Sequence, residues 1–192
     1  CEESCTAGAI SKDESVFESI DESKCILCGK FINACPFGSI IERTDLFDIM
    51  QLLRDKRPIS AIIAPSIFGQ FSVAPGAIFD ALYKLGFTGI VEVAEGAAET
   101  TLHEAVEFTE RLEEGEPFMT TSCCPSWVMA AQKHIPAMLP HISSTPSPMA
   151  YAALKARKLH PGAPVVFIGP CLAKRKEGKD NPAVDWVMTF EE

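Results

Sequence analysis

The stretch Ile59-Ser60-Ala61-Ile62-Ile63-Ala64-Pro65-Ser66 decides the fold. Residues 59–63 are almost entirely apolar, which is typical of a short buried strand, and Ala64-Pro65-Ser66 ends that strand in a turn. Apolar residues recur at helical spacing just before it, at Leu46, Ile49, Met50 and Leu53. A helix followed by a buried strand and a turn indicates the beginning of a βα alternation.

The same alternation continues toward the C-terminus. We expect helices near residues 77–85, 99–113, 125–134 and 148–158, and strands near 89–93, 118–121 and 165–168. The apolar residues of the 99–113 helix are expected to face inward: Leu102, Ala105, Val106, Thr109 and Leu112. Such a pattern predicts an α/β fold in which helices cover both faces of a parallel sheet.

Composition excludes several classes of protein. The chain has 192 residues, of which 47% are hydrophobic and 22% charged, so it is not disordered. A net charge of -9 argues against nucleic acid as a partner, and no apolar run approaches the ~20 residues of a membrane span. The chain begins at Cys1 without a visible secretory signal, so we expect a fragment or processed product of a cytoplasmic protein.

Eight cysteines fall into two groups separated by a long gap, which predicts two sites. They are Cys1, Cys5, Cys25, Cys28, Cys35, Cys123, Cys124 and Cys171. A secreted disulfide framework usually scatters cysteines through a small domain without a core, whereas these lie in CxxC and CP contexts within a chain of high apolar content. We therefore expect them to ligate a metal or a cluster rather than to form disulfides.

Residues 1–42 contain the first group. The segment Cys25–Pro36 has the frame of the ferredoxin run C-x2-C-x2-C-x3-C-P, but Phe31 stands at the third ligand position. Cys1-x3-Cys5 upstream is similar to the end of a first such run. We predict a truncated ferredoxin-like iron–sulfur domain that binds [4Fe-4S] clusters.

In two-cluster ferredoxins the last cysteine of each run ligates the cluster of the other run. Cys5 would then join Cys25 and Cys28, and Cys35 would join Cys1. A structural zinc ion held by four of the cysteines is the alternative, and the CP endings favour iron–sulfur.

Three turns in the rest of the chain each lie between an expected strand and an expected helix. They are Ala64–Ser66, Ser122–Pro125 and Gly169–Cys171. Ligands of open parallel sheets bind outside the carboxyl ends of the strands, so these turns are expected to converge on one pocket. A helix N-terminus lowers the pKa of a thiol, which makes Cys124 and Cys171 suitable ligands for a soft metal.

Two of these turns carry a specific resemblance. Thr121-Ser122-Cys123-Cys124-Pro125-Ser126-Trp127 and Pro170-Cys171-Leu172-Ala173-Lys174-Arg175-Lys176-Glu177 resemble the first two signature motifs, TSCCPxW and PCxxKxxE, of [FeFe]-hydrogenases. The resemblance covers essentially the whole chain. It implies that residues 43–192 are the first part of the parallel-sheet H-cluster domain. A third motif, which carries two further ligand cysteines, would come from a C-terminal segment in cis or on another chain.

The resemblance also implies a set of site residues. Cys124 and Cys171 would ligate the [4Fe-4S] half of the H-cluster, whose di-iron half carries CO, cyanide and a bridging dithiolate. The residues expected to bind the cofactor are Ala64, Pro65, Ser66, Ser122, Ser147, Pro148 and Lys174. Among them, Lys174 would donate a hydrogen bond to a cyanide. The chain departs from the best-known members at Gly169, where they have Met, and at Met149, where they have a polar residue.

The proton-transfer residues implied by the resemblance begin with the thiol of Cys123. The other members of the chain would be Glu104, Ser143, Glu107 and Arg111. Glu104, Glu107 and Arg111 share one helix face at i, i+3 and i+7. The alternatives are a structural role for Cys123 and a solvated charged face for the helix.

By the same resemblance, the function would be the reversible interconversion of protons and electrons with H2. A ferredoxin or similar carrier would exchange electrons with the [4Fe-4S] clusters. A hydrogenase-like factor of iron–sulfur cluster assembly and a hydrogen or redox sensor are the alternatives. Cys123 and Lys174 favour the enzyme or the sensor, because an assembly factor needs neither a proton donor nor a cyanide anchor.

Overall fold

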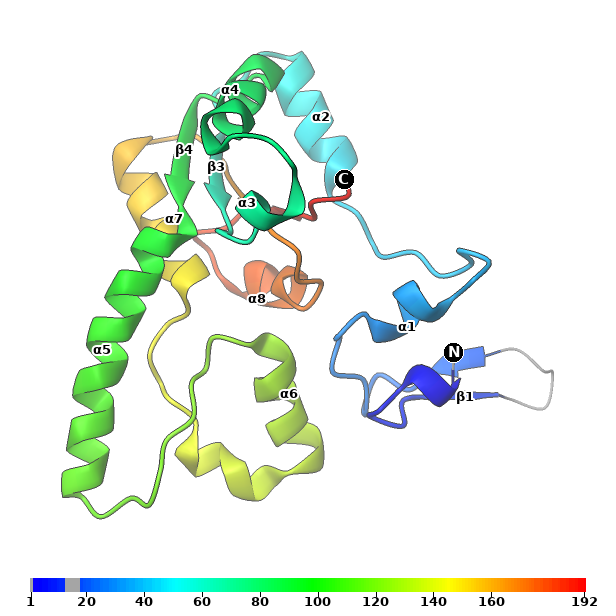
Figure 1. Cartoon of the computed structure of the whole chain (residues 1–192), viewed down its shortest axis with the longest axis vertical. Helices are drawn as coiled ribbons and strands as arrows, with labels where there is room; N and C mark the ends of the chain where they lie inside the picture. Colours follow the sequence, from blue (N-terminus) through cyan, green and yellow to red (C-terminus); the bar gives the residue numbers. More distant parts are fainter. Residues whose placement is uncertain (1, 13–17) are drawn as a thin grey trace.

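A four-stranded parallel sheet forms the centre of the structure, a computed structural model that describes residues 2–12 and 18–192. Its strands are β3 (Ser60–Ile63), β4 (Gly89–Glu92), β5 (Val165–Ile168) and β6 (Trp186–Met188), in the order β4-β3-β5-β6 (Figure 1). Ile62 of β3 is in register with Val91 of β4 and with Phe167 of β5. The prediction of an α/β fold with a parallel sheet is confirmed.

Helices cover both faces of this sheet, as the alternation predicted. Ile62 and Phe167 face a core that includes α7 (Pro148–Leu159), whereas Ile63 faces the core formed with α2 (Leu46–Arg54) and α4 (Pro75–Leu85). All residues of β3 and β5 are buried. A strand covered on both faces reads as a continuous apolar run, which explains why these strands were evident in the sequence.

The remaining described elements are short, apart from one long helix. They are η1 (Glu2–Ser4), β1 (Ile10–Lys12), β2 (Glu18–Ile20), α1 (Lys30–Ala34), α3 (Ile67–Gln70), α5 (Val93–Glu113), α6 (Pro125–His134), η2 (Pro136–His141) and α8 (Lys174–Asp180). None of the described helices is long and apolar enough to cross a membrane.

The expected start and inner face of the helix near 99–113 are wrong. Helix α5 begins at Val93, directly after β4, and Gly96 packs closely on the backbone of α7 at Pro148 and Ala152. Leu102 and Val106 are 66% and 59% exposed. The inner face is instead the stripe of Val93, Gly96 and Thr100 that continues through Glu104, Glu107 and Arg111.

The expected strand at 118–121 is not part of the sheet. In this segment Thr120 forms a single parallel bridge with Ile142, supported by hydrogen bonds from Thr120 N to His141 O at 2.7 Å and from Ser143 N to Thr120 O at 2.8 Å. Strand β6, by contrast, was not expected, since its three residues follow Pro182, Asp185 and a stretch without a clear period.

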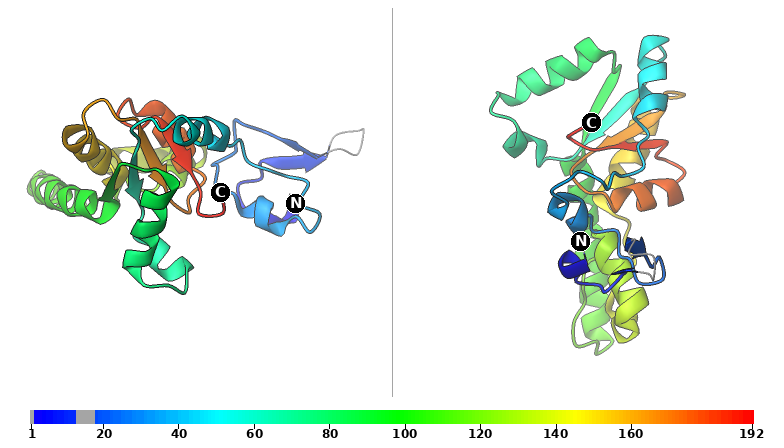
Figure 2. Two further views of the ribbon diagram at one scale, coloured as in Figure 1. Left: turned by 90° about the horizontal axis from the view of Figure 1, so that it is seen from above. Right: turned by 90° about the vertical axis from the view of Figure 1, so that its right-hand side faces the viewer.

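The described part of residues 1–42 lies beside the sheet domain, next to α6 and α8 (Figures 1 and 2). It contains the antiparallel pair of β1 and β2 and the short helix α1. Its buried apolar residues are Ala9, Ile10 and Cys25. The division into residues 1–42 and 43–192 as two domains stays a prediction.

Candidate functional site

Cys124 is the N-cap residue of α6, and Pro125 occupies the first turn of that helix. Two contacts hold the turn that precedes it. Trp127 Nε1 donates to Thr120 Oγ1 at 3.1 Å, and Ser122 Oγ donates to the carbonyl of Thr145 at 2.6 Å. The expected position of a thiol at a helix N-terminus is confirmed for Cys124 and is wrong for Cys171, which lies two residues before the N-cap Ala173 of α8.

Cys123 precedes this cap, and its Sγ lies 3.3 Å from Thr121 Oγ1. Lys174, the first residue of α8, donates through Nζ to the carbonyl of Cys123 at 3.1 Å and to Glu177 Oε2 at 2.5 Å. The side chain of Lys174 is only 12% exposed. The two cysteine motifs, which are separated by more than forty residues in sequence, therefore meet through this lysine.

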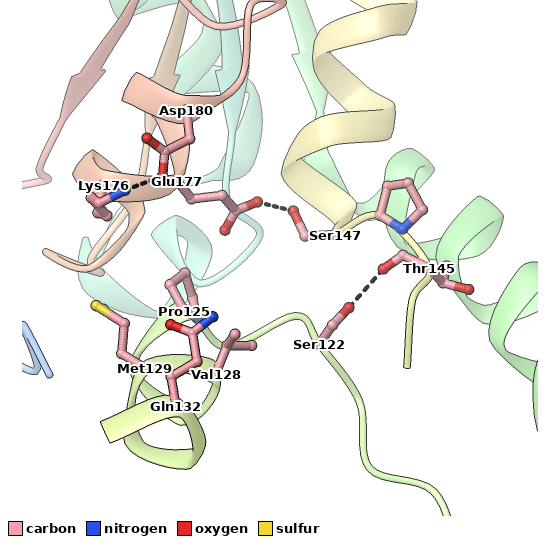
Figure 3. A pocket seen from close by; sticks show the side chains of 11 residues that line it. Ser122, Pro125, Val128, Met129, Gln132, Thr145, Ser147, Lys176, Glu177 and Asp180 are labelled. Atoms are coloured by element: carbon pink, nitrogen blue, oxygen red, sulfur yellow. Dashed lines mark hydrogen bonds and ion pairs between the residues drawn. The ribbon is translucent and has the colours of Figure 1, made fainter. Parts of the chain in front are cut away.

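Glu177, the last residue of the second motif, accepts a second hydrogen bond from Ser147 Oγ (Figure 3). Ser147 is the N-cap of α7, and its hydroxyl also accepts from Ala150 N at 3.4 Å. Glu177 thus links α8 to the start of α7. The motif contained Glu177, but the sequence indicated no role for it.

A cavity of about 400 Å³ lies between α6, α8 and the segment before α7 (Figure 3). Among the residues expected to bind a cofactor, Ser122 and Ser147 line it. Its other lining residues are Pro125, Val128, Met129, Gln132, Thr145, Pro146, Lys176, Glu177 and Asp180. Polar groups from three separate segments surround a space that is large enough for a small ligand.

The turn after β3 lies next to the turn after β5. Ala64 N donates to Ile168 O at 2.9 Å, and a Cβ built on Gly169 would be 3.2 Å from Ala64 Cβ. Pro65 and Ser66 follow Ala64 at this edge, and Ser66 precedes α3 without a capping bond from its side chain. Of the three turns expected to converge, these two meet at the carboxyl edge of the sheet, whereas the third, Ser122–Pro125, does not follow a strand of the sheet.

The departures at Gly169 and Met149 have packing explanations. A Cβ on Gly169 would lie 2.5 Å from Phe167 Cζ, so the Phe167 ring occupies the space that a side chain there would need. Met149 is 1% exposed and belongs to the core that contains Ala64 and Phe167.

Glu107 is the centre of a hydrogen-bond network that joins α5 to residues 140–145. Its carboxylate accepts from Ser143 Oγ at 2.6 Å, from Thr145 Oγ1 at 2.9 Å and from Ser144 N at 2.9 Å. Arg111 Nη2 lies 2.7 Å from the same carboxylate and also donates to the carbonyl of Ile142 at 3.0 Å. Three of the five expected proton-transfer residues, Ser143, Glu107 and Arg111, are therefore in direct contact.

The environment of Glu107 keeps it ionised. Burial by itself raises the pKa of this carboxyl, but hydrogen bonds from Ser143, Ser144 and Arg111 outweigh burial and lower the pKa to about 2. The side chains of Glu107 and Arg111 are 15% and 20% exposed, so the solvated-face alternative is wrong for these residues.

Glu104 lies one turn earlier on the same face of α5 and is half-buried. Its Oε1 is fully buried and has no hydrogen-bond partner among the residues that the structure describes. This oxygen is free to accept a hydrogen bond from a water molecule or another proton donor.

The first cysteine group is described except for Cys1, which lies outside the described residues. Cys5, Cys25, Cys28 and Cys35 are free thiols. Ala9 N donates to Cys5 Sγ at 3.2 Å, and backbone N–H groups of Ser39 and Phe37 lower the pKa of Cys35. At Cys35 these contacts favour the thiolate, the form that binds iron.

Among residues 2–12 and 18–192, no three His, Cys, Asp or Glu side chains lie in an arrangement for binding a metal ion. The chemistry of the thiols nevertheless fits an iron–sulfur group. The soft donors are free thiols, and backbone N–H groups lower the pKa of one of them, Cys35.

The class of protein follows from comparison with known sequences. Residues 57–192 match the family described as the iron only hydrogenase large subunit, C-terminal domain, and the chain belongs to this family. Iron hydrogenase 1 of Clostridium pasteurianum is 31% identical, with 87% of this chain and 40% of that protein covered. The periplasmic [Fe] hydrogenase large subunit of Nitratidesulfovibrio vulgaris is also 31% identical, with 86% of this chain and 52% of the relative covered.

A different function occurs among the similar proteins. The cytosolic Fe-S cluster assembly factor NAR1 of Meyerozyma guilliermondii is 30% identical over 126 residues, which cover 57% of this chain and 24% of that protein. The chain spans about half or less of the length of each of these relatives.

Proposed function

We propose that this chain takes part in hydrogenase catalysis, in which two protons and two electrons combine reversibly to give H2. The observation that carries the proposal is the hydrogen bond from Lys174 Nζ to the carbonyl of Cys123, because it joins the two cysteine motifs of the family at one place. Cys124 and Cys171 would hold the [4Fe-4S] half of an H-cluster beside this contact. When bound, the H-cluster supplies the iron chemistry at which protons and electrons combine.

The chain's own residues would deliver the proton. The thiol of Cys123 would exchange it with the reacting site, and Arg111 and Glu107 would form the end of the route near solvent. Glu104 supports this role because its buried, unpartnered Oε1 can accept a hydrogen bond from a proton-carrying group. Glu107, with a pKa of about 2, would carry a proton only transiently and would otherwise hold Ser143 in place.

Lys174 would act as a fixed cation. Its Nζ is held between the carbonyl of Cys123 and the carboxylate of Glu177, which leaves one of its three protons for a ligand. Ser147 in turn holds Glu177, so the cation is supported by the N-terminus of α7. A positioned ammonium group in a site of low exposure binds an anionic ligand such as cyanide without reorganisation.

Electrons would pass through the first cysteine group, in a ferredoxin-like domain formed by residues 1–42. The free thiols and the N–H contacts to Cys5 and Cys35 support cluster binding there. A ferredoxin or a similar carrier would be the external electron partner.

Infrared spectroscopy of the anaerobically maturated protein, with the segment that carries the third motif present, tests the proposal, and hydrogen evolution from a reduced dye is measured on the same sample. CO and cyanide stretching bands together with hydrogen turnover are the expected result. A sample that contains iron–sulfur clusters without these bands would instead favour an assembly role, for which the similarity to the cytosolic assembly factor is the supporting observation. Bands without turnover would favour a sensor.

A further inference from the structure

His141, the last residue of η2, lies against the segment that follows α5. Its Nδ1 is 3.0 Å from Glu116 Oε2, and the two side chains are 21% and 38% exposed. The imidazole ring also packs on Phe118, with ring centroids 4.4 Å apart and planes inclined by 33°. The segment after α5 therefore contacts His141 through both a carboxylate and an aromatic ring.

The strength of the contact between His141 and Glu116 depends on the charge of the ring. Nδ1 is fully buried and, although it is close to the carboxylate, it is not aligned with it for a hydrogen bond. A neutral imidazole can present a lone pair at this nitrogen, which a carboxylate repels, whereas a protonated imidazole presents an N–H and a positive charge. Histidine side chains change charge between pH 5 and 8. The contact is therefore attractive at the acidic end of this range and weak at the basic end.

The carbonyl groups on either side of His141 bind the guanidinium of Arg111. Nη1 of Arg111 donates to the carbonyl of Pro140 at 2.7 Å, and Nη2 donates to the carbonyl of Ile142 at 3.0 Å. Glu116 is attached to the same residue through the backbone, since Glu116 N donates to Arg111 O at 2.9 Å. The contact between His141 and Glu116 thus closes a ring of contacts around Arg111.

Arg111 and Glu107 are the charged groups that α5 presents to this segment, and they form an ion pair with each other. Because their charges compensate, Glu116 is the charge that responds to protonation of His141. Ser143, two residues after His141, donates to the Glu107 carboxylate at 2.6 Å. A displacement of the backbone at His141 would therefore loosen the bonds of Arg111 and of Glu107 together.

We propose that His141 and Glu116 are positioning residues, which hold the guanidinium of Arg111 in place, and that protonation of His141 strengthens their hold. The ring takes its proton from water and returns it to water, and no other bond changes. A role of this contact in proton delivery rests on the proposed function. The positioning itself involves only residues of this chain and requires no cluster.

Amide hydrogen exchange of the full chain, measured by NMR at pH 5.5 and pH 7.5, tests the inference. The amides of Ser143 and Ser144 report on the network, because they donate to Thr120 O at 2.8 Å and to Glu107 Oε1 at 2.9 Å. Their protection factors, which compare exchange with that of an unfolded chain at the same pH, should be about threefold higher at pH 5.5 than at pH 7.5. In His141→Gln the factors should be low at both pH values.

Three further variants separate charge from other effects. His141→Arg keeps a positive charge and a planar group against Phe118, so its protection factors should be high at both pH values. Glu116→Gln should behave like His141→Gln, and it keeps the test valid if His141→Gln does not fold. His103→Gln is the matched control, because His103 is a histidine of α5 that stacks on Tyr151 at a centroid distance of 5.4 Å. This variant should keep the pH dependence of the unaltered protein.

Protection factors that are equal at both pH values in the unaltered protein would overturn the inference. Full protection in both His141→Gln and Glu116→Gln would also overturn it, as would low protection in His141→Arg at pH 5.5. Hydrogen evolution by the maturated protein is a separate measurement. If the maturated protein produces no H2 and the amides show the expected pattern, the proposed function fails and the positioning role of His141 and Glu116 stands.

Discussion

The hydroxyl of Ser143 donates a 2.6 Å hydrogen bond to Glu107 across 36 positions of sequence. Ser143 is 4% exposed, so the bond is shielded from water. It fixes the second half of α5 against the segment that leads to α7. The hydrogen bond gives Glu107 a structural role as well as its proposed place in proton transfer. The structural role predicts an effect of Glu107→Gln on the free energy of unfolding.

Glu107→Gln should lower the stability of the protein at neutral pH. The pKa of Glu107 in the folded protein is about 2, below its ordinary value of 4.5, so the carboxylate stabilises the fold above pH 4.5. This contribution is lost as the pH falls from 4.5 toward 2. Each pH unit between the folded and the ordinary pKa of Glu107 corresponds to about 1.4 kcal/mol of stability. Because the side chain is partly exposed to solvent, we expect the carboxylate to contribute about 1–3 kcal/mol to the free energy of unfolding.

Urea denaturation between pH 7 and pH 3 measures this contribution. The difference in the free energy of unfolding between the unaltered protein and Glu107→Gln should shrink on acidification. Glu110→Gln on the exposed face of α5 is the control and should change stability by less than about 0.5 kcal/mol. A difference that is independent of pH would show that hydrogen-bond geometry, and not the charge, is what Gln disturbs.

The sequence predicted the parallel sheet because buried strands leave a plain signal. Strands β3 and β5 are buried throughout and apolar except for Ser60, and their turns meet at the carboxyl edge because the strands are parallel neighbours. Leu102 and Val106 of α5 were misassigned to the inner face for a physical reason. The segment that α5 contacts offers carbonyls and hydroxyls, so charged residues fill the contact and the apolar residues face outward.

The candidate site was predictable where it consists of motifs, and not where it depends on packing. Cys124 at a helix cap follows from the turn–helix order of its motif. The bond from Lys174 to the Cys123 carbonyl does not follow from strand order, because the segment before Cys123 is not a strand of the sheet. The contact of Leu172 with Gly29 and the bonds from Lys133 to backbone carbonyls leave no trace in residue spacing. Any residue presents a carbonyl, so such partners carry no sequence signal.

Cys123→Ser and Cys124→Ser should fail in different ways, although the two residues are adjacent. Cys124→Ser should reduce the iron content, because Cys124 is the proposed ligand. Cys123→Ser should keep its iron and lose most of its hydrogen turnover, because a serine hydroxyl is a far weaker acid than a thiol. Iron analysis and hydrogen evolution on both purified variants measure this. Undiminished turnover in Cys123→Ser would make the thiol structural.

Phe31→Cys should supply the fourth ligand to the iron–sulfur site proposed for Cys5, Cys25 and Cys28. Phe31 stands where the ferredoxin run has its third ligand, and it lines a cavity together with Cys25. In the unaltered protein, mild oxidation should release the iron without a cysteine and produce a three-iron signal in electron paramagnetic resonance. Phe31→Cys should abolish that signal. Phe37→Cys, at a position that is 87% exposed, should leave it unchanged.

Lys133→Met should loosen the loop around Cys25 and shift its cluster to a more negative reduction potential. Two hydrogen bonds from a charged donor are lost, which costs about 1 kcal/mol at an exposed position. Amide exchange of residues 22–28 should therefore become about fivefold faster. The potential should fall because a reduced cluster carries one more negative charge, and a nearby ammonium group favours that state.

Two further variants separate charge from geometry at this position. Lys133→Arg keeps the charge and the donors, so its potential should stay close to that of the unaltered protein while amide exchange rises only slightly. Lys158→Met removes a comparable exposed charge on α7, away from the cysteines, and should alter neither quantity. Faster amide exchange in Lys133→Met with an unchanged reduction potential would mean that Lys133 stabilises the loop through its hydrogen bonds and that its charge does not affect the cluster. An unchanged exchange rate would mean that the two hydrogen bonds from Lys133 Nζ to the loop carbonyls do not stabilise the loop.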